Sequence, residues 1–289
     1  MPNTREIQLR IRSISGTQQI TRAMKLVSTA KLQKIRGIAE AGRPYFKQVY
    51  QTVCSILQAS GADILEQTGF SQPADAEKGP VLYVLITSDR GLAGGYNANV
   101  CRLLEAAIAD KQAARIVTVG RKGREYFERR GYTLDAHFSL HDEVPKIGEI
   151  QRMAEHIMKL YADGEVSGVQ LVYTAFRNTL SQEAQLVRLL PLSSEDFEGS
   201  EDGFVSMNYE PGEEAVLKRI MPMYLSGILQ GALSEASASE QGARMTAMDS
   251  ATDNAGEMID NLTLQYNRAR QGHITQELTE IINGAAALE

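Results

Sequence analysis

Apolar and small residues recur at alternating steps of three and four along the C-terminal stretch from Gly242 to Glu289. The repeat consists of Met245, Met248, Thr252, Ala255, Ile259, Leu262, Tyr266 and Ala269, and after a slip of one residue it restarts as Ile274, Leu278, Ile281, Ala285 and Leu288. A mean period of 3.5 predicts a long helix that supercoils with a partner helix. The alternative is a core helix of a large bundle, but such helices seldom keep so regular a seam over this length.

The N-terminal residues carry the second half of this predicted coiled coil. The same spacing runs through Ile7, Ile11, Ile14 and Gln18, continues in Ile20, Met24 and Val27, and shifts to Ile35, Ala39, Gly42, Phe46, Val49, Val53 and Ile56. A helix over residues 4–60 would be ~80 Å long, far more than a globular domain needs. Pro44 is expected to kink this helix or to mark its exit from the coiled coil. Because the two helices lie at opposite ends of the chain, we expect an antiparallel intramolecular pair.

The central part of the chain alternates predicted strands and helices. The continuous apolar run from Val81 to Thr87 is typical of a strand buried on both faces. Further strands are expected at residues 115–119, 134–138, 169–176, 186–192 and 204–209, and helices at 97–110, 122–130 and 147–161. Alternating elements predict an open, mostly parallel sheet. The expected fold class is therefore α/β, with a long antiparallel coiled coil of N- and C-terminal helices plus a central Rossmann-like α/β domain.

This pattern divides the chain into four parts. Residues 1–60 form the N-terminal coiled-coil helix, 61–79 a linker rich in Gly, Pro, Asp and Gln, 80–210 the α/β domain, and 211–289 the C-terminal coiled-coil helix. The chain of 289 residues is 43% hydrophobic and 23% charged, as in soluble globular proteins. Aromatic residues make up only 6% and tryptophan is absent. Such a composition favours long helices packed through small aliphatic seams.

The net charge of -6 hides opposite charges at the two ends of the chain. Residues 1–60 contain ten Lys and Arg against Glu6 and Glu40, and residues 235–289 contain three Arg against nine acids. A basic helix would therefore lie against an acidic one. Nucleic-acid binding is an alternative use of the basic face, but its charges are spread out and no aromatic residues interleave with them. A solvated face and a surface that meets an acidic protein partner are the other interpretations.

Nothing in the sequence indicates a membrane span, a secretory signal or a disulfide framework. No apolar run approaches the ~20 residues that cross a bilayer, and the N-terminus has no apolar signal-peptide core. The two cysteines, Cys54 and Cys101, make neither a disulfide framework nor a metal site. We expect both to be reduced in a cytoplasmic protein.

The glycine-rich turn at residues 91–95 resembles a phosphate loop in its position between a strand and a helix. It matches neither G-x-G-x-x-G nor G-x-x-x-x-G-K-[ST], and it has no Lys-Ser/Thr for phosphate and Mg²⁺. Glycines kept for tight strand–helix packing are the competing explanation. The four histidines, His137, His141, His156 and His273, have no ligand spacing and no nucleophile motif nearby. We therefore expect no catalytic residue, no cofactor and no metal.

Four motifs resemble the γ subunits of F-type ATP synthases. They are QITRAMKLV at residues 19–27, TSDRGLAGG at 87–95, SEQGARMTAM at 239–248 with ATDN at 251–254, and YNRARQ at 266–271 followed by ITQELTEI at 274–281. The resemblance covers essentially the whole chain, and its C-terminal motifs are the most specific. Two long terminal helices around a small α/β domain are also the plan of that family.

The resemblance implies a rotor with no catalytic site of its own. In the family one such chain stands as the central shaft within three α and three β subunits, with its C-terminal end deepest. Its α/β domain forms a foot that sits on the membrane c-ring and binds the ε subunit. Ion flow through a proton- or sodium-translocating membrane sector turns the ring and shaft, and the shaft drives the catalytic β sites through their conformations. ATP hydrolysis drives the reverse.

The resemblance also assigns expected roles to single residues. Contacts that carry torque to the β subunits are expected at Met24, Lys25, Arg244, Arg270, Gln271, Thr275 and Glu277. The small apolar bearing tip is expected at Ile281, Ile282, Ala285 and Leu288, and contacts with ε and the c-ring at Tyr209 and Glu210. The expected partners are thus α, β, ε and the c-ring, with no nucleic acid and no insertion into the membrane.

Two missing features refine these expectations. Photosynthetic members of the family insert a dithiol segment between Leu-Leu-Pro-Leu and Tyr-Glu-Pro motifs, but here Leu192 and Tyr209 are separated by 16 residues without cysteine. No thiol regulation is expected. The lack of a transit peptide favours a bacterial protein on the cytoplasmic face of the inner membrane, held there peripherally. A self-associating structural coiled coil with an α/β head is the runner-up, and a nucleotide-binding α/β enzyme is the third candidate.

Overall fold

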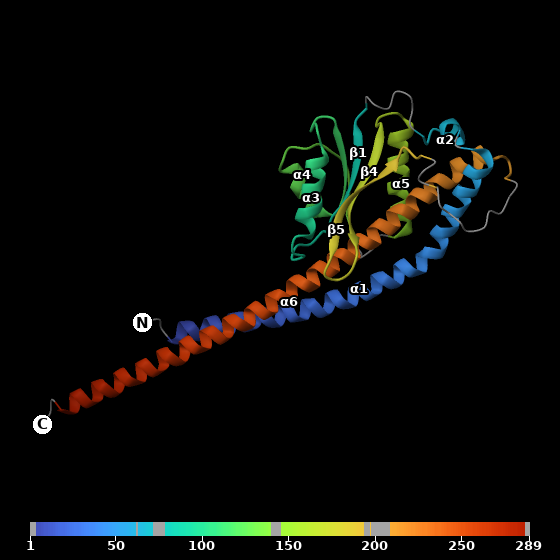
Figure 1. Cartoon of the computed structure of the whole chain (residues 1–289). Coiled ribbons are helices and arrows are strands. Elements are labelled where there is room, and N and C mark those ends of the chain that lie inside the picture. The colour runs from blue at the N-terminus through green and yellow to red at the C-terminus, as the bar shows by residue number, and fades with distance from the viewer. Residues whose placement is uncertain are drawn as a thin grey trace. The chain divides into compact units, whose positions relative to one another are not determined.

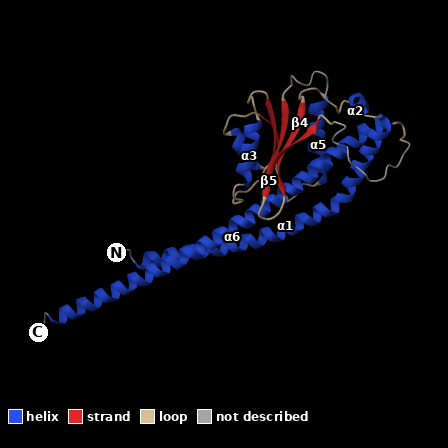
Figure 2. Ribbon diagram, viewed as in Figure 1, coloured by secondary structure: helices blue, strands red, loops and turns tan. Residues whose placement is uncertain are grey.

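The structure is a computed structural model that describes residues 4–61, 63–71, 79–139, 146–193, 197 and 209–286, with side chains to residue 283. Its elements are α1 (Thr4–Ser60), α2 (Asp63–Thr68), β1 (Val81–Ile86), α3 (Tyr96–Ala107), β2 (Ala114–Val119), α4 (Arg121–Glu128), β3 (Leu134–Phe138), α5 (Ile147–Ala162), β4 (Gly168–Phe176), β5 (Gln182–Leu190) and α6 (Glu213–Ala286). Figures 1 and 2 show the two long helices and the sheet. The predicted fold class is confirmed.

The chain packs as two compact units, which are described separately. The helical unit contains residues 1–28 and 244–289, and the mixed unit contains residues 29–243. Both long helices are therefore shared between units, whereas the sequence pattern assigned each helix to one part. The expected linker at residues 61–79 also differs from the structure, because it contains α2, whose Ile64 and Leu65 are buried. The expected strand at 204–209 lies outside the described residues except for Tyr209.

The mixed unit is built on a five-stranded sheet in the order β3-β2-β1-β4-β5. β1 pairs in parallel with β2 and β4, β2 pairs in parallel with β3, and the edge strand β5 is antiparallel to β4. The residues of β1 alternate between the two faces of the sheet. Leu82, Val84 and Ile86 join the core with α5, α6 and the end of α1, while Tyr83 and Leu85 pack on the side of α3 and α4. The sheet is thus buried on both faces, as its apolar runs predict.

Tight strand–helix packing occurs at Gly120 and Gly123, whereas Gly91 has open space around it. Gly120 has φ of 90°, and a Cβ there would lie 2.2 Å from the Thr87 carbonyl oxygen. A Cβ on Gly123 would lie 2.9 Å from Thr87 Oγ1, which accepts a hydrogen bond from the Gly123 amide. A Cβ on Gly91 would meet nothing within 4 Å. Glycine is therefore required where α4 begins.

Within the mixed unit, α1 and α6 run antiparallel. Phe46 packs on Gly227, where a Cβ would lie 2.5 Å from Phe46 Cδ1. Further along, Ser60 Oγ donates to Glu213 Oε2 at 2.6 Å. Pro44 does not end the pairing, because α1 continues through it and Phe46 follows in contact with α6. The expectation that Pro44 marks the exit from the coiled coil is therefore wrong.

Within the helical unit the pair is also antiparallel, but its seam is more polar than expected. Thr21 Oγ1 lies 2.7 Å from Thr252 Oγ1, and Gln18 Nε2 donates to the Thr252 carbonyl. In the part of α1 that belongs to this unit, the buried positions are Ile7, Thr21 and Ser28, whereas Ile20 and Val27 are 62% and 55% exposed. The sequence prediction moved the seam to Ile20, whereas the structure keeps the spacing from Gln18 to Thr21 and so places hydroxyls inside. The predicted continuation through Ile20 and Val27 is therefore wrong.

The α6 half of this seam follows the prediction and then stops. Met248, Thr252 and Ala255 are buried, and Ile259, Leu262, Tyr266 and Ala269 are half-buried. Gly272 is the last half-buried position among the described side chains, and Ile274, Leu278 and Ile281 are exposed. The predicted restart of the seam at Ile274 is not part of the helix pair, because α1 begins only at Thr4.

Candidate functional site

The expected torque residues near the middle of the pair are partly engaged within the chain itself. Lys25 Nζ lies 2.5 Å from Asp249 Oδ1, so its charge is paired across the two helices. Met24 is half-buried, and Arg244 is only 7% exposed. A buried guanidinium is held by its own surroundings before any partner arrives. Met24 and Lys25 therefore offer more surface to a second protein than Arg244 does.

The expected torque residues further along α6 are all exposed. Arg270, Gln271, Thr275 and Glu277 lie beyond Ala269, the last half-buried residue of the predicted repeat. Thr275 Oγ1 donates to the Gln271 carbonyl at 2.9 Å, and Glu277 Oε1 lies 3.2 Å from His273 Nδ1. These contacts stay within one helix, so the polar groups remain accessible to a partner.

The expected bearing tip presents large apolar side chains to solvent. Ile281 and Ile282 are 69% and 65% exposed. Ala285 lies in α6 without a described side chain, and Leu288 lies outside the described residues. A helix end that exposes neighbouring isoleucines is unusual in a monomeric soluble protein and indicates a surface covered by another chain.

Exposed apolar side chains concentrate on the helical unit as a whole. Among the described residues, sixteen large hydrophobic side chains are exposed, and ten of them belong to this unit, which holds about a quarter of the chain. The ten are Leu9, Ile20, Leu26, Val27, Met258, Leu264, Ile274, Leu278, Ile281 and Ile282. Sequence reasoning missed Ile20 and Val27 because it placed them in the seam. Exposed on both helices, these side chains form a surface suited to a protein environment on more than one side.

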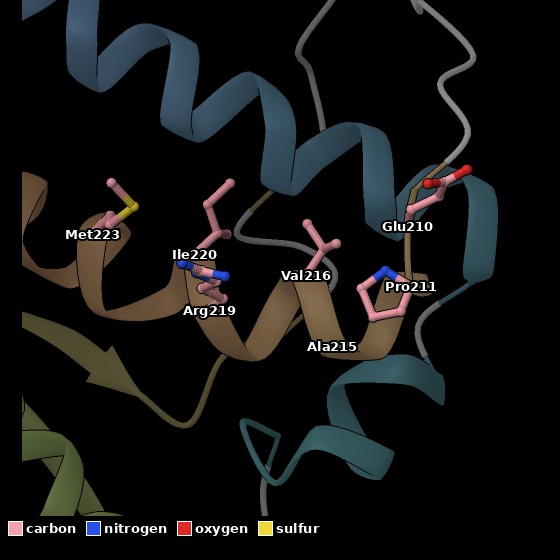
Figure 3. Close-up of a pocket in the computed structure, with 7 residues that line it drawn as sticks. All are labelled: Glu210, Pro211, Ala215, Val216, Arg219, Ile220 and Met223. Carbon is pink, nitrogen blue, oxygen red and sulfur yellow. The ribbon is translucent and has the colours of Figure 1, made fainter.

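A groove of about 390 Å³ lies at the start of α6 in the mixed unit (Figure 3). One face of the helix supplies most of its lining, and the segment before the helix supplies the rest: Glu210, Pro211, Ala215, Val216, Arg219, Ile220 and Met223. Glu210 is exposed, as the expected contact with ε and the c-ring requires. Tyr209 is half-buried against the main core, so it anchors this segment to the core. The spacing of residues 215, 219 and 223 at steps of four was the available sequence signal for this groove.

The Gly91–Gly95 turn is held by side chains of the chain itself. The Asn97 side chain accepts from the Ser88 amide and donates to Ser88 Oγ, which in turn donates to the Arg90 carbonyl. Leu92 has φ of 63° and is exposed. These bonds tie the end of the segment after β1 to the start of α3. Among the described residues, no group of three or more His, Cys, Asp or Glu could hold a metal ion.

A polar cluster lies beside this turn at the carboxyl ends of the strands. Asp89 Oδ1 accepts from the Arg121 amide at 2.7 Å, and Thr118 Oγ1 lies 3.1 Å from His137 Nδ1. Burial lowers the pKa of His137, and the nearby Arg124 charge adds to this effect. The histidine is therefore a neutral hydrogen-bonding residue near neutral pH, with Ser139 Oγ 3.2 Å from its Nε2. No helix in the described part of the chain is long and apolar enough to cross a membrane.

Comparison with known proteins assigns the chain to a family. The family model described as ATP synthase matches residues 3–288. The sodium-ion-specific ATP synthase gamma chain of Acetobacterium woodii is 41% identical over 99% of each chain, and the ATP synthase gamma chain of Lachnoclostridium phytofermentans is 44% identical over the full length of both. The chain belongs to the ATP synthase gamma-chain family.

Solved structures share its fold. The rotor of the Euglena gracilis mitochondrial ATP synthase has a TM-score of 0.67 at 19% identity, covering 94% of this chain and 98% of that one. The central stalk and c-ring structure of the Tetrahymena thermophila mitochondrial ATP synthase contains a chain with a TM-score of 0.59 at 24% identity, covering 80% of this chain and 99% of that one. Two long helices with a mixed α/β domain are thus shared by distant rotor chains.

Proposed function

We propose that the chain is the central rotor shaft of an F-type ATP synthase. It is a non-catalytic subunit of the complex, and it couples rotation of an ion-driven c-ring to the conformational cycle of the catalytic β subunits. During ATP hydrolysis the coupling runs in reverse. The observation that carries this proposal is the set of ten exposed large apolar side chains on the helical unit. Burying such side chains against other chains is favourable, and leaving them in water would promote aggregation.

The helical unit would stand within three α and three β subunits. Its tip at Ile281 and Ile282 offers large apolar contacts without charge, which suits a bearing that must slide. Met24 would supply an apolar contact beside the torque-carrying polar contacts, which would come from Lys25, Arg270, Gln271, Thr275 and Glu277. Arg244 would act from its buried position by holding the shape of the seam that the β subunits meet. Ala285 and Leu288 would extend the tip.

The mixed unit would form the foot that meets ε and the c-ring. The groove lined by Glu210 and Arg219 pairs an apolar floor with one carboxylate and one guanidinium at the surface. It would take an apolar side chain flanked by charges of either sign, with Tyr209 fixing the segment in place. The protein would thus be peripheral, at the cytoplasmic face of the bacterial inner membrane.

Co-expression with the matching α and β subunits tests this function. We expect one copy of the chain per three α and three β subunits by native mass determination, with ATPase activity. A chain lacking residues 244–289 should not support that activity. Two milder test variants, Ile20→Ser and Val27→Ser, each remove an apolar side chain from the exposed surface. Ser13→Ala is the matched control, because it changes an exposed position without removing an apolar contact. A stable homodimer that does not bind the α and β subunits would favour the self-associating coiled coil.

A further inference from the structure

The hairpin between β4 and β5 has a turn that its own side chains make rigid. Asn178 Oδ1 accepts from the amides of Leu180 and Ser181 at 2.9 and 2.8 Å. The Gln182 side chain donates to the carbonyls of Asn178 and Thr179 at 3.2 and 2.8 Å. An Asn side chain that satisfies two turn amides restricts the loop to one conformation. The hairpin tip is therefore a stiff projection of the sheet.

This projection contacts α1 through Phe176, the last residue of β4. The Phe176 ring packs against a small cluster formed by Leu32 and Ile35 of α1 and Ala238 of α6, all of them buried. The Arg36 guanidinium carbon lies 5.4 Å from the centre of the same ring, within the range of a cation–π contact. One side chain of the hairpin thus touches both long helices.

The hairpin also contacts α6 at Ser239 and Gly242. Ser239 Oγ, which is fully buried, donates to the Thr174 carbonyl at 3.0 Å. At Gly242 a Cβ would lie 3.4 Å from both Phe176 Cε2 and Gln182 Nε2, and 3.6 Å from the Thr179 carbonyl oxygen. The hairpin therefore lies on the helix surface at a distance that admits a methyl group and nothing larger.

These contacts occupy one level along the helix pair, at the margin of the mixed unit. Residues 238–242 are among the last residues of α6 in this unit, and residues 32–36 are among the first of α1. We propose that the β4–β5 hairpin is a brace that fixes both helices to the sheet, so that torque on the foot reaches the two helices together at this level. The proposal rests on the rotor function proposed above.

The brace acts through close packing. A rigid turn, an aromatic ring between two helices and a buried hydroxyl bond resist sliding and twisting of the pair over the sheet, because each can move only by losing contacts in a dense core. The Leu180 side chain at the tip is 82% exposed and takes no part in these contacts, whereas its amide, which bonds Asn178, is kept in Leu180→Ser. It therefore offers a control at the same place in the chain.

Single-molecule rotation of the α, β and γ complex tests the proposal. The complex is fixed through its β subunits, and the angle of a probe on the foot is recorded during pauses between steps. Phe176→Ala and Gly242→Leu should both broaden the angular distribution, which is a loss of torsional stiffness. Gly242→Ala and Leu180→Ser should leave the distribution unchanged. Native mass determination of each variant confirms that the complex still assembles.

Amide hydrogen exchange of the free chain provides a second readout. If the hairpin braces both helices, Phe176→Ala accelerates amide hydrogen exchange at residues 32–36 and 238–242, while the amides of β1 stay protected. Unchanged angular widths and unchanged exchange in both Phe176→Ala and Gly242→Leu would overturn the brace. If Phe176→Ala fails to fold, the comparison of Gly242→Leu with Gly242→Ala tests the brace by itself. An unaltered chain that neither assembles nor rotates would contradict the rotor function, and the exchange experiment would still test the brace.

Discussion

Thr21 of α1 and Thr252 of α6 face each other in the seam of the helical unit, with their hydroxyl oxygens 2.7 Å apart. Both side chains are buried. Each hydroxyl has a single proton, so when one threonine donates to the other, the accepting hydroxyl donates to a carbonyl of its own helix, that of Gln18 for Thr21 or that of Met248 for Thr252. The two hydroxyls thus form a hydrogen-bonded layer where coiled coils usually place apolar side chains. Polar layers of this kind favour one register at a cost in stability.

This layer predicts strong coupling between the two threonines. Thr252→Val removes one hydroxyl and leaves its partner with fewer contacts, which should lower the free energy of unfolding by about 1 kcal/mol. Thr21→Val combined with Thr252→Val replaces both polar groups with apolar ones of similar shape and should recover most of that loss. Thermal unfolding followed by circular dichroism compares the single variants Thr252→Val and Thr21→Val with the double variant. Losses that simply add in the double variant would contradict a shared hydrogen-bonded layer.

The approach of β1 to α4 predicts a large difference between two glycine substitutions. Gly120→Ala places a Cβ 2.2 Å from the Thr87 carbonyl oxygen in a backbone with φ of 90°, so we expect it to destabilise the foot by on the order of 3 kcal/mol. Gly91→Ala meets no atom within 4 Å and should change stability little. Denaturant unfolding of both variants makes the comparison, and equal midpoints would contradict it.

The depressed pKa of His137 predicts a loss of foot stability in mild acid. Because burial lowers its pKa in the folded chain, the unfolded chain binds the proton more readily below the ordinary value of about 6.5. The contribution of His137 is therefore complete above that pH and is lost as the pH falls through it toward the folded pKa. His137→Gln should reduce this pH dependence. Thermal midpoints at about pH 5.5 and 7.5 compare the two chains, and identical shifts would exclude His137 as a source.

Both cysteines are predicted to be inert toward mild redox reagents. Cys54 and Cys101 are free and buried, and burial raises the pKa of Cys101 to about 12. The reactive thiolate is therefore scarce at neutral pH. We expect the ATPase rate of the assembled complex to be the same before and after dithiol reduction. A rate change that disappears in Cys54→Ser with Cys101→Ser would show regulation through these thiols.

The long helices and the sheet could be predicted because their signals are regular. A repeat at steps of three and four led to α1 and α6, and the run from Val81 to Thr87 led to a doubly buried central strand. The register of α1 could not be predicted in the same way. Ile20 and Thr21 stand one step apart, and hydrophobicity alone favours Ile20 for the seam. The hydrogen bond to Thr252 outweighs that preference, and it involves a residue at the other end of the chain.

The surfaces of the foot were less visible in the sequence. Glu210 could be assigned through its motif, but the groove beside it depends on which face of α6 is covered by the core. The brace was missed because Phe176, Asn178 and Gly242 have no shared motif. Their relation comes from the antiparallel pairing of β4 with β5, which brings Phe176 opposite Gln182.

Equal numbers of residues separate successive contacts along α1 and along α6. Residues 21 and 46 of α1 contact residues 252 and 227 of α6, so the same number of residues separates the contacts on each helix. Residues 46 and 60 against 227 and 213 repeat this equality within the mixed unit. An insertion in one helix alone would therefore misalign the contacts on one side of it. The shaft can change length in evolution or by engineering only through paired insertions, in multiples of the seven-residue repeat that returns side chains to the seam.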